Sequence, residues 1–247
     1  MVVLSPLTSA PAAQPVGAAI RLFLDTPLVG VDRVELAPPQ AHYLINVMRR
    51  SVGDRLRVFN GRDGEFVASV AEARRRVQLA IGPCLRPQSA EPDIWLAFAL
   101  LKRGPTELIV QKATELGVAR LQPLFTTRTN ADRINLARLT AIATEAAEQS
   151  ERLTVPTLLP PCALGVVLGT WPPDRPLVAC LERATDIPFT RGLSGATGIL
   201  IGPEGGFTDA ELDAVRGHPF VRPATLGPRV LRAETAAIVA LALLQAG

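Results

Sequence analysis

Two glycine-containing segments near the carboxyl end of the chain combine residue types that could bind a ligand. In the first, an apolar run at 199–201 leads into the sequence GPEGGF at 202–207. In the second, an expected strand that ends at Ala224-Thr225-Leu226 leads into Gly227, Pro228 and two arginines, Arg229 and Arg232. Glycine lets a backbone approach a ligand closely, and ligands of parallel α/β sheets bind where strands end. Both segments are therefore candidate parts of a binding site.

The two segments do not match the common nucleotide motifs. GPEGGF lacks the spacing of GxGxxG, and no Lys-Ser or Lys-Thr pair follows it as in a phosphate-binding loop. An NAD or ATP site is therefore not supported. Each segment by itself could be an ordinary turn between a strand and a helix, but two such segments in one domain favour a site.

The elements that must position these loops alternate along residues 94–247. Short apolar runs predict buried strands, and amphipathic or Ala-rich stretches between them predict helices. This alternation predicts an α/β fold with a mainly parallel sheet. The expected strands are 94–101, 118–125, 177–181, 198–201 and 221–226, and the expected helices are 105–116, 133–149, 209–215 and 233–245.

The preceding part of the chain has a different pattern. Short alternating runs predict strands, and the Asn-Gly and Asp-Gly pairs within 60–64 predict a hairpin turn. Several short strands and one helix, at 42–50, suggest a small barrel. We expect four regions: a disordered extension or misassigned start at 1–20, the barrel at 21–86, a proline-marked linker at 87–93 and the α/β domain at 94–247. The expected strands of the barrel are 21–25, 34–36, 55–59, 65–70 and 77–81.

Positive charge is concentrated in the barrel region. Residues 21–86 hold eleven arginines and seven acidic residues, a balance of +4, whereas the rest of the chain has a balance of −1. A basic module beside a neutral one is typical of a polyanion platform attached to a catalytic body. An ordinary solvated surface is the alternative, and the use of Arg in place of Lys could reflect genomic composition.

The remaining composition excludes several classes of protein. The three cysteines and two histidines are isolated, so no metal site and no Cys/His nucleophile is expected. Free, separated cysteines are typical of a reducing compartment. No run reaches the ~18 apolar residues of a membrane span, and residues 1–20 lack a signal-peptide pattern. We expect a cytoplasmic protein without membrane contact.

GPEGGF at 202–207 followed by LGPRVLRAETA at 226–236 resembles the bacterial 16S ribosomal RNA uridine-N3 methyltransferases, a family of the knotted SPOUT class. The resemblance extends over about residues 21–246. It includes ALLK at 99–102, QKATELGV at 111–118, PLFTTR at 123–128 and EAAEQS at 145–150, and in the first module residues 42–50, 52–54 and 60–61. Two positions depart from the family, since Ser150 stands where many relatives carry Cys and Ala233 where Thr is common.

The resemblance implies a fold, a cofactor and an assembly. The fold is a PUA-like barrel followed by a trefoil-knotted, mainly parallel sheet with helices on both faces, and the assembly is a homodimer. The cofactor is S-adenosyl-L-methionine, held in the knot loops. Carried over position by position, the cofactor-binding residues are Leu181, Ile201, Gly202, Pro203, Glu204, Gly205, Gly206, Leu226, Gly227 and Leu231.

The implied reaction places chemical demands on the site. N3 of uridine carries a proton and becomes a good nucleophile only when that proton leaves, so negative charge on the ring must be stabilised. Arg232 is our candidate for this catalytic role, and Glu204 is a weaker candidate for proton acceptor, because it could equally bond loop amides. The expected partner is 16S ribosomal RNA or the small subunit. The candidate RNA-binding residues are Arg21, Arg49, Arg50, Lys102, Arg103 and Arg128.

Two alternatives to uridine-N3 methylation stay open. A related enzyme could methylate a ribose 2′-oxygen or another base, because one fold hosts several chemistries. A protein that has lost catalysis could bind RNA as a ribosome assembly factor. The intact GPEGG and LGPRVLR segments argue against the second alternative.

Overall fold

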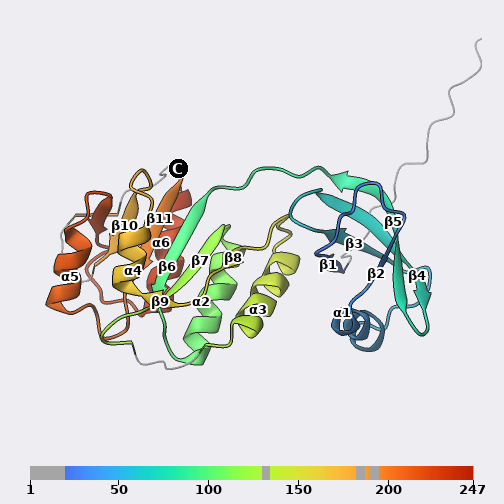
Figure 1. Cartoon of the computed structure of the whole chain (residues 1–247), viewed down its shortest axis with the longest axis horizontal. Coiled ribbons are helices and arrows are strands. Elements are labelled where there is room, and N and C mark those ends of the chain that lie inside the picture. Colours follow the sequence, from blue (N-terminus) through green and yellow to red (C-terminus); the bar gives the residue numbers. More distant parts are fainter. Residues whose placement is uncertain (1–19, 130–133, 182–186, 190–194, 247) are drawn as a thin grey trace, which may run out of the picture.

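The structure is a computed structural model that describes residues 20–129, 134–181, 187–189 and 195–246. Two modules lie at opposite ends of its long axis (Figure 1). The expectation for residues 1–20 falls outside the described residues, apart from Ile20. No helix in the described part of the chain is long and apolar enough to cross a membrane.

The first module is a five-stranded, curled sheet with the strand order β1-β3-β4-β5-β2. Inward-facing side chains such as Leu56 and Val58 alternate with more exposed neighbours along β3 and form a separate hydrophobic core. The expected small β-barrel is confirmed as a half-barrel. Its strands are β1 (Arg21–Phe23), β2 (Arg33–Glu35), β3 (Arg55–Phe59), β4 (Glu65–Ala73) and β5 (Val77–Arg86).

The helix of this module begins and ends earlier than expected. It consists of α1 (Pro38–His42), which continues into a π-helical turn, η1 (Tyr43–Val47). Proline is tolerated in a first helical turn, so Pro38 and Pro39 begin the helix rather than exclude it. The helix ends before Arg49, which has a left-handed backbone with φ of 53°. The expected range 42–50 is therefore wrong at both ends.

The second module contains a sheet in which every strand pair is parallel. The strand order is β12-β10-β11-β6-β7-β8, and β9 also pairs with β7. The mainly parallel sheet expected from the sequence is confirmed. The strands are β6 (Ile94–Ala99), β7 (Arg120–Phe125), β8 (Thr157–Leu158), β9 (Cys162–Ala163), β10 (Leu177–Cys180), β11 (Thr197–Ile201) and β12 (Val221–Ala224).

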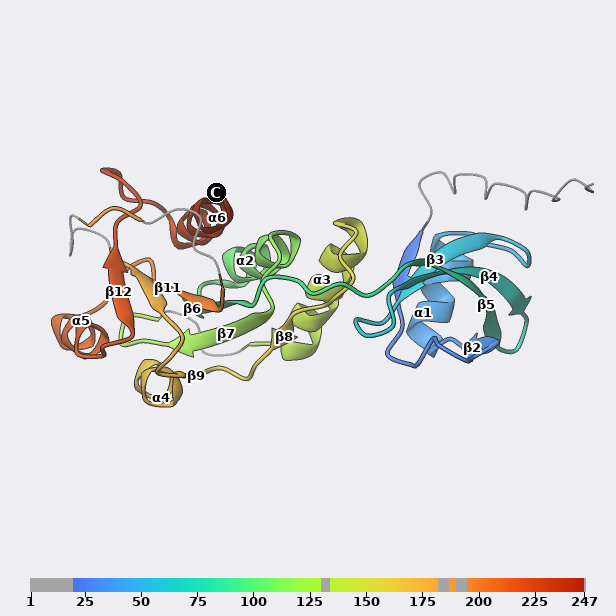
Figure 2. The same ribbon diagram turned by 90° about the horizontal axis from the view of Figure 1, so that it is seen from above.

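Helices cover both faces of this sheet. Leu96 and Phe98 of β6 face one core, and Ala97 and Ala99 face the other, as the two-residue period of a strand requires. The first core is covered by α2 (Arg103–Glu115), α3 (Leu136–Gln149) and α6 (Ala233–Gln245). The second is covered by α4 (Leu164–Thr170) and α5 (Asp209–Arg216). Figure 2 shows α2 and α6 above the sheet, α4 below it and α5 at the outer edge beside β12.

The sequence did not predict α4, β8 or β9. Helix α4 has only seven residues, two of them glycines, so its local helix propensity is low. The strands β8 and β9 have two residues each, which is too short for a recognisable alternation. Their formation depends on packing and pairing with distant segments. The trefoil knot stays a prediction, since strand order and register define neighbours in the sheet and not the threading of the chain.

The modules contact each other at the carboxyl end of α3. Arg21 of β1 donates hydrogen bonds from Nη1 to the carbonyl oxygens of Ala147 and Glu148, at 2.8 and 2.9 Å. Its Nη2 donates to the carbonyl oxygen of Arg152 at 2.6 Å. Arg21 is buried, and its guanidinium binds main-chain carbonyl groups of the second module. The expectation that Arg21 contacts RNA is therefore corrected.

Candidate functional site

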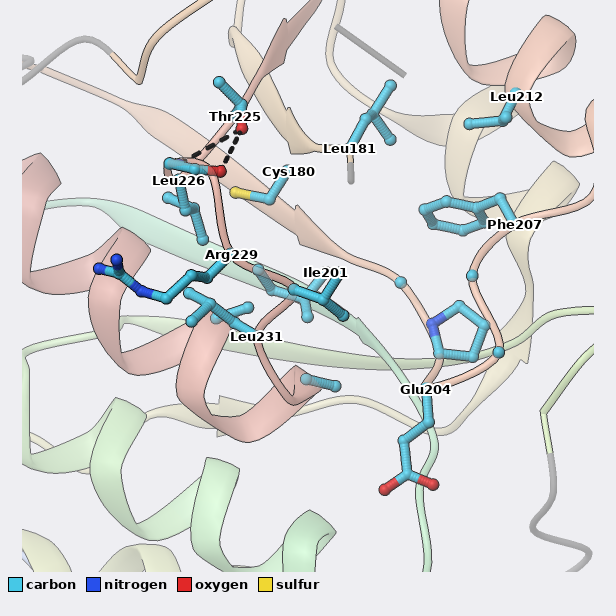
Figure 3. A pocket seen from close by; sticks show the side chains of 18 of the residues that line it. Cys180, Leu181, Ile201, Glu204, Phe207, Leu212, Thr225, Leu226, Arg229 and Leu231 are labelled. Carbon is cyan, nitrogen blue, oxygen red and sulfur yellow. Dashed lines mark hydrogen bonds between the residues drawn. The ribbon is translucent and has the colours of Figure 1, made fainter. Parts of the chain in front are cut away.

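A cavity of about 290 Å³ lies where β10, β11 and β12 end. This volume is near the lower end of the ~300–1,000 Å³ of small-molecule sites. Two loops, 202–207 and 225–231, form most of its lining. Cys180, Leu181, Ile201, Leu212, Ala233 and Ala236 complete it (Figure 3).

Sheet register brings the two loops together. Cys180 at the end of β10 is level with Ile201 of β11 on one side and with Ala224 of β12 on the other. The three strands are parallel, so the segments that follow them leave the sheet at the same edge. This arrangement joins GPEGGF and LGPRVLR into one site, although eighteen residues, 208–225, separate them along the chain.

All ten residues expected to bind the cofactor line this cavity. Their contact with S-adenosylmethionine stays a prediction. The sequence also missed some of the lining. Phe207, Thr225 and Arg229 belong to the segments already singled out, so their position beside the glycines was an available signal. Cys180 and Leu212 carry no such signal and are brought to the cavity by the fold.

The glycines have different reasons to be there. A Cβ on Gly202 would lie 2.8 Å from a ring atom of Phe207, so this position requires glycine for close packing of the loop. Gly206 and Gly227 have φ values of 69° and 120°, which disfavour other residues, and a Cβ on either would meet open space. The loops are thus shaped by backbone geometry and leave room beside it.

The lining fits a ligand with a flat, hydrogen-bonding ring. Apolar side chains, including Ile201 and Leu231, supply walls. In the described part of the chain, the main-chain N–H groups of Leu226, Val230 and Leu231 have no hydrogen-bond partner. Such groups can bond the edge of an adenine whose faces the apolar side chains cover. The residues present therefore fit the cofactor that the resemblance implies.

The loop after β7 supports the glycine loop from outside. Arg128 donates from Nη1 to the carbonyl oxygen of Gly205 at 2.8 Å. The backbone N–H of Thr127 donates to Oε1 of Glu211 at 2.7 Å. Burial tends to raise the pKa of Glu211, but hydrogen bonds from Thr127 and Thr208 outweigh it and lower that pKa, so the carboxylate stays charged. Arg128, one of the RNA-binding candidates, is exposed, and its hydrogen bond stabilises the 202–207 loop.

The two catalytic candidates are placed differently. Glu204 lines the cavity, is exposed, and points away from Leu181 and Thr225 in Figure 3. Arg232 is exposed at the N-cap of α6 and is not among the described residues that line the cavity. Arg229, three residues earlier, does line it. The sequence analysis chose Arg232 for the catalytic role, whereas the described lining of the cavity contains Arg229 in its place.

Cys180 is the one thiol in the described lining. Burial raises the pKa of this thiol to about 12. The nucleophilic form of cysteine is the thiolate, which is almost absent at neutral pH when the pKa is so high. Cys180 therefore packs in the cavity wall and cannot act as a nucleophile there.

The other RNA-binding candidates lie on two surfaces. Arg49 is exposed and Arg50 half-buried, just after η1 in the first module. Lys102 and Arg103 are exposed at the start of α2, beyond the carboxyl end of β6. The structure does not gather these residues into one patch.

Comparison with known proteins identifies both modules. Residues 88–245 match a family model described as an RNA methyltransferase domain, and residues 36–81 match an RNA methyltransferase PUA domain. The chain is 33% identical over 230 residues to ribosomal RNA small subunit methyltransferase E of Rickettsia conorii, an alignment that covers 90% of this chain and 93% of the relative.

Two solved structures agree with this comparison. A Legionella pneumophila protein in complex with the bound cofactor SAM has a TM-score of 0.82 and 32% identity, over 92% of this chain and 97% of that one. Ribosomal RNA small subunit methyltransferase E from Neisseria gonorrhoeae, bound to S-adenosyl methionine, has a TM-score of 0.79 and 28% identity, over 91% and 95% of the two chains.

Proposed function

This chain belongs to the RNA methyltransferase family, and we propose that it methylates N3 of a uridine in 16S ribosomal RNA with S-adenosylmethionine as methyl donor. One observation carries the proposal. Ten residues expected from the family's loops meet around one cavity at the carboxyl edge of the parallel sheet. The relatives named as small-subunit methyltransferase E and the neighbours solved with the cofactor support the same reaction.

The cavity residues would hold the cofactor through backbone and apolar contacts. Main-chain groups of Leu226 and Leu231 would bond the adenine, and Ile201 and Leu181 would cover it. When bound, S-adenosylmethionine supplies a methyl group activated by a sulfonium. Glu204 is exposed and lines the cavity, and its side chain would meet the cationic part of such a ligand or accept the uridine N3 proton.

Stabilisation of charge on the uracil ring is the second task. A uracil that loses its N3 proton carries negative charge on its two oxygens, and a guanidinium can donate hydrogen bonds to them. Arg229 lines the cavity, and we assign this role to it together with Arg232, which would approach from the solvent side of α6.

RNA would bind across both modules. Arg49 and Arg50 on the first module, and Lys102, Arg103 and Arg128 on the second, would contact phosphates, which position a strand without reading its sequence. We further propose that the protein acts in the cytoplasm, as a homodimer, on the small ribosomal subunit or its RNA.

Mass spectrometry of nucleosides tests the proposed function. Small-subunit RNA from a strain lacking the gene should lack one N3-methyluridine, and the purified protein with S-adenosylmethionine should restore it. Loss of a 2′-O-methyl nucleoside or another methylated base would instead support the related-enzyme alternative. An unchanged set of nucleosides, with RNA binding retained, would support an assembly factor.

A further inference from the structure

A second and larger cavity, of about 740 Å³, lies beyond the carboxyl end of β6. It opens between the first turn of α2 and the first turn of α3. Leucine side chains, including Leu101 and Leu139, form its floor, and Lys102, Arg103 and Arg138 lie at its rim. Its volume is within the ~300–1,000 Å³ typical of small-molecule sites.

The sheet places this cavity next to the cofactor site. β6 and β11 are parallel neighbours, and Phe98 is level with Ile201. Neighbouring strands lie about 4.8 Å apart. The segment that follows Ile201 begins the GPEGGF loop, and the segment that follows Phe98 leads within two residues to Leu100, which lines the second cavity. The two cavities therefore open from adjoining strand ends.

Local hydrogen bonds shape the second cavity in advance. Thr106 Oγ1 accepts from the backbone N–H of Leu101 at 3.1 Å and donates to the carbonyl oxygen of the same residue at 3.0 Å. On the other side, Asn135 Oδ1 accepts from the backbone N–H of Arg138 at 3.0 Å and so caps α3. Both walls are fixed by bonds within the protein, and among the described residues the Nδ2 group of Asn135 has no hydrogen-bond partner, so it can act as a donor.

The rim carries more positive than negative charge. Glu107 accepts hydrogen bonds from Arg138 and Arg103, which lower its pKa to about 2 and keep it ionised. Two guanidinium groups thus share one carboxylate, and among the described residues no carboxylate pairs with Lys102. The first turn of α2 also contains no acidic residue. An apolar floor under such a rim is complementary to a nucleobase that carries a phosphate.

We propose that this cavity receives the nucleotide to be methylated, a pyrimidine ribonucleotide turned out of the RNA strand. Its base would lie on the leucine floor beside Asn135 Nδ2, and its phosphate near Lys102. Enzymes that modify a base take it out of the stack, and unstacked bases of single-stranded RNA are bound in this way. The inference rests on the proposed function, because only a methyltransferase needs an acceptor site beside the donor cavity.

Selective labelling tests the site without measuring methylation. Lys102 and Lys112 are the only lysines of the chain. Uridine 5′-phosphate oxidised by periodate to its 2′,3′-dialdehyde forms an imine with a nearby amine, and borohydride fixes it. We expect peptide mass spectrometry to find Lys102 modified in preference to Lys112, and excess uridine 5′-phosphate to prevent the reaction.

The control reagent is the dialdehyde of methyl riboside, which lacks base and phosphate. It should show neither the preference for Lys102 nor the protection. Equal labelling of both lysines by the nucleotide reagent, or no protection by uridine 5′-phosphate, would overturn the acceptor site. This outcome is independent of whether the protein methylates ribosomal RNA, so failure of the proposed function is a separate result.

Variants of the full chain test the same site through the reaction. Leu136→Trp would fill the cavity, and Lys102→Ala, at an exposed residue, would remove its unpaired charge with little effect on folding. Loss of a hydrogen bond to a charged group is worth roughly tenfold, so Lys102→Ala should lower kcat/KM for RNA by about that factor, and Leu136→Trp should also lower it because the indole leaves no room for a base. Cofactor affinity should stay unchanged, as should kcat/KM in Lys112→Ala, the matched control. Wild-type kcat/KM in both cavity variants would contradict the proposal.

Discussion

Arg21 and Glu65 form a buried ion pair, with 2.6 Å between Nε and Oε1. Their side chains are 4% and 1% exposed, and the remaining guanidinium donors of Arg21 bind carbonyl oxygens at the carboxyl end of α3. Those carbonyls carry partial negative charge, which a cation stabilises. At the amino end of α3, the N-cap residue Asn135 lies in the wall of the second cavity. One helix therefore connects the first module to the proposed acceptor site.

Removal of Arg21 should destabilise the protein strongly. Arg21→Ala leaves Glu65 buried beside the more exposed Arg86 and Arg57, and breaking a buried pair in this way costs about 3–5 kcal/mol. The matched control is Arg76→Ala, whose partner Glu35 is exposed, and here the change should be below about 1 kcal/mol. Urea unfolding gives both values. Equal losses in the two variants would show that burial of the Arg21 pair contributes nothing.

A second prediction concerns Glu148, which lies beside the same junction. Burial raises the pKa of Glu148, and Glu145 raises it further, while the hydrogen bond from the Phe23 N–H and the charge of Arg21 oppose this. A carboxyl group with a raised pKa favours folding below its unfolded pKa, and that contribution is lost as pH rises through the folded value. Glu148→Gln keeps the acceptor oxygen without the charge.

Glu148→Gln should therefore raise the melting temperature relative to wild type at pH 7–8, and the gain should shrink at pH 4. Melting curves across this range are the measurement. If the difference in melting temperature between Glu148→Gln and wild type grew toward acid pH, desolvation of the Glu148 carboxylate would be excluded as its cause.

The packing of Gly202 against Phe207 predicts a selective loss of cofactor binding. In Gly202→Val the new side chain would displace the Phe207 ring and the loop that follows. A cofactor at 100 times its Kd stabilises the folded state by about 2.7 kcal/mol, which corresponds to roughly 5–10 °C in Tm. Wild type should show this shift, and Gly202→Val should show little of it.

Gly165→Val is the matched control for the cofactor test. A Cβ at Gly165, on the exposed side of α4, meets nothing within 4 Å. Its shift with S-adenosylmethionine should equal that of wild type. A normal shift in Gly202→Val would remove the 202–207 loop from the cofactor site.

The exposed Arg49 should contribute to RNA binding through phosphate contact. Arg49→Ala should weaken binding by roughly tenfold and reduce the slope of log K against log salt by about 0.7, the counterion release of one single-strand contact. Filter binding to small-subunit RNA at several salt concentrations measures both. Arg216→Ala on α5, at the opposite end of the molecule in Figure 1, is the control. An unchanged slope for Arg49→Ala would mean that this arginine is only solvated.

Substitutions of Arg229 and Arg232 should lower the rate of methyl transfer by different factors. Loss of a charge-stabilising donor typically lowers turnover by ~10²–10³, and we expect this for Arg229→Ala because Arg229 lines the cavity. Arg232→Ala should lower turnover less, and Arg232→Lys should recover little, since an ammonium lacks the planar fork. Single-turnover methylation assays measure the rate of each variant, and melting curves show whether each variant is folded. Folded variants of both residues that react at the wild-type rate would exclude arginine from the mechanism.

The sequence by itself determined most of the elements and the content of the cofactor loops. β3 (Arg55–Phe59) and α6 (Ala233–Gln245) have the bounds that local alternation and apolar periodicity predict, because neighbouring residues decide them. The glycine-rich segments were recognisable because close packing, as at Gly202, and left-handed backbone, as at Gly206 and Gly227, restrict the residue type at single positions.

Only the tertiary structure decided which distant residues meet. The level ends of β10, β11 and β12 brought the two loops into one cavity, and the pairing of β6 with β11 placed a second cavity beside it. Arg21 looked like any other arginine of a basic module, yet contacts more than 120 residues away bury it. Burial, charge pairing and strand register arise from long-range packing, and no local pattern of residue types encodes them.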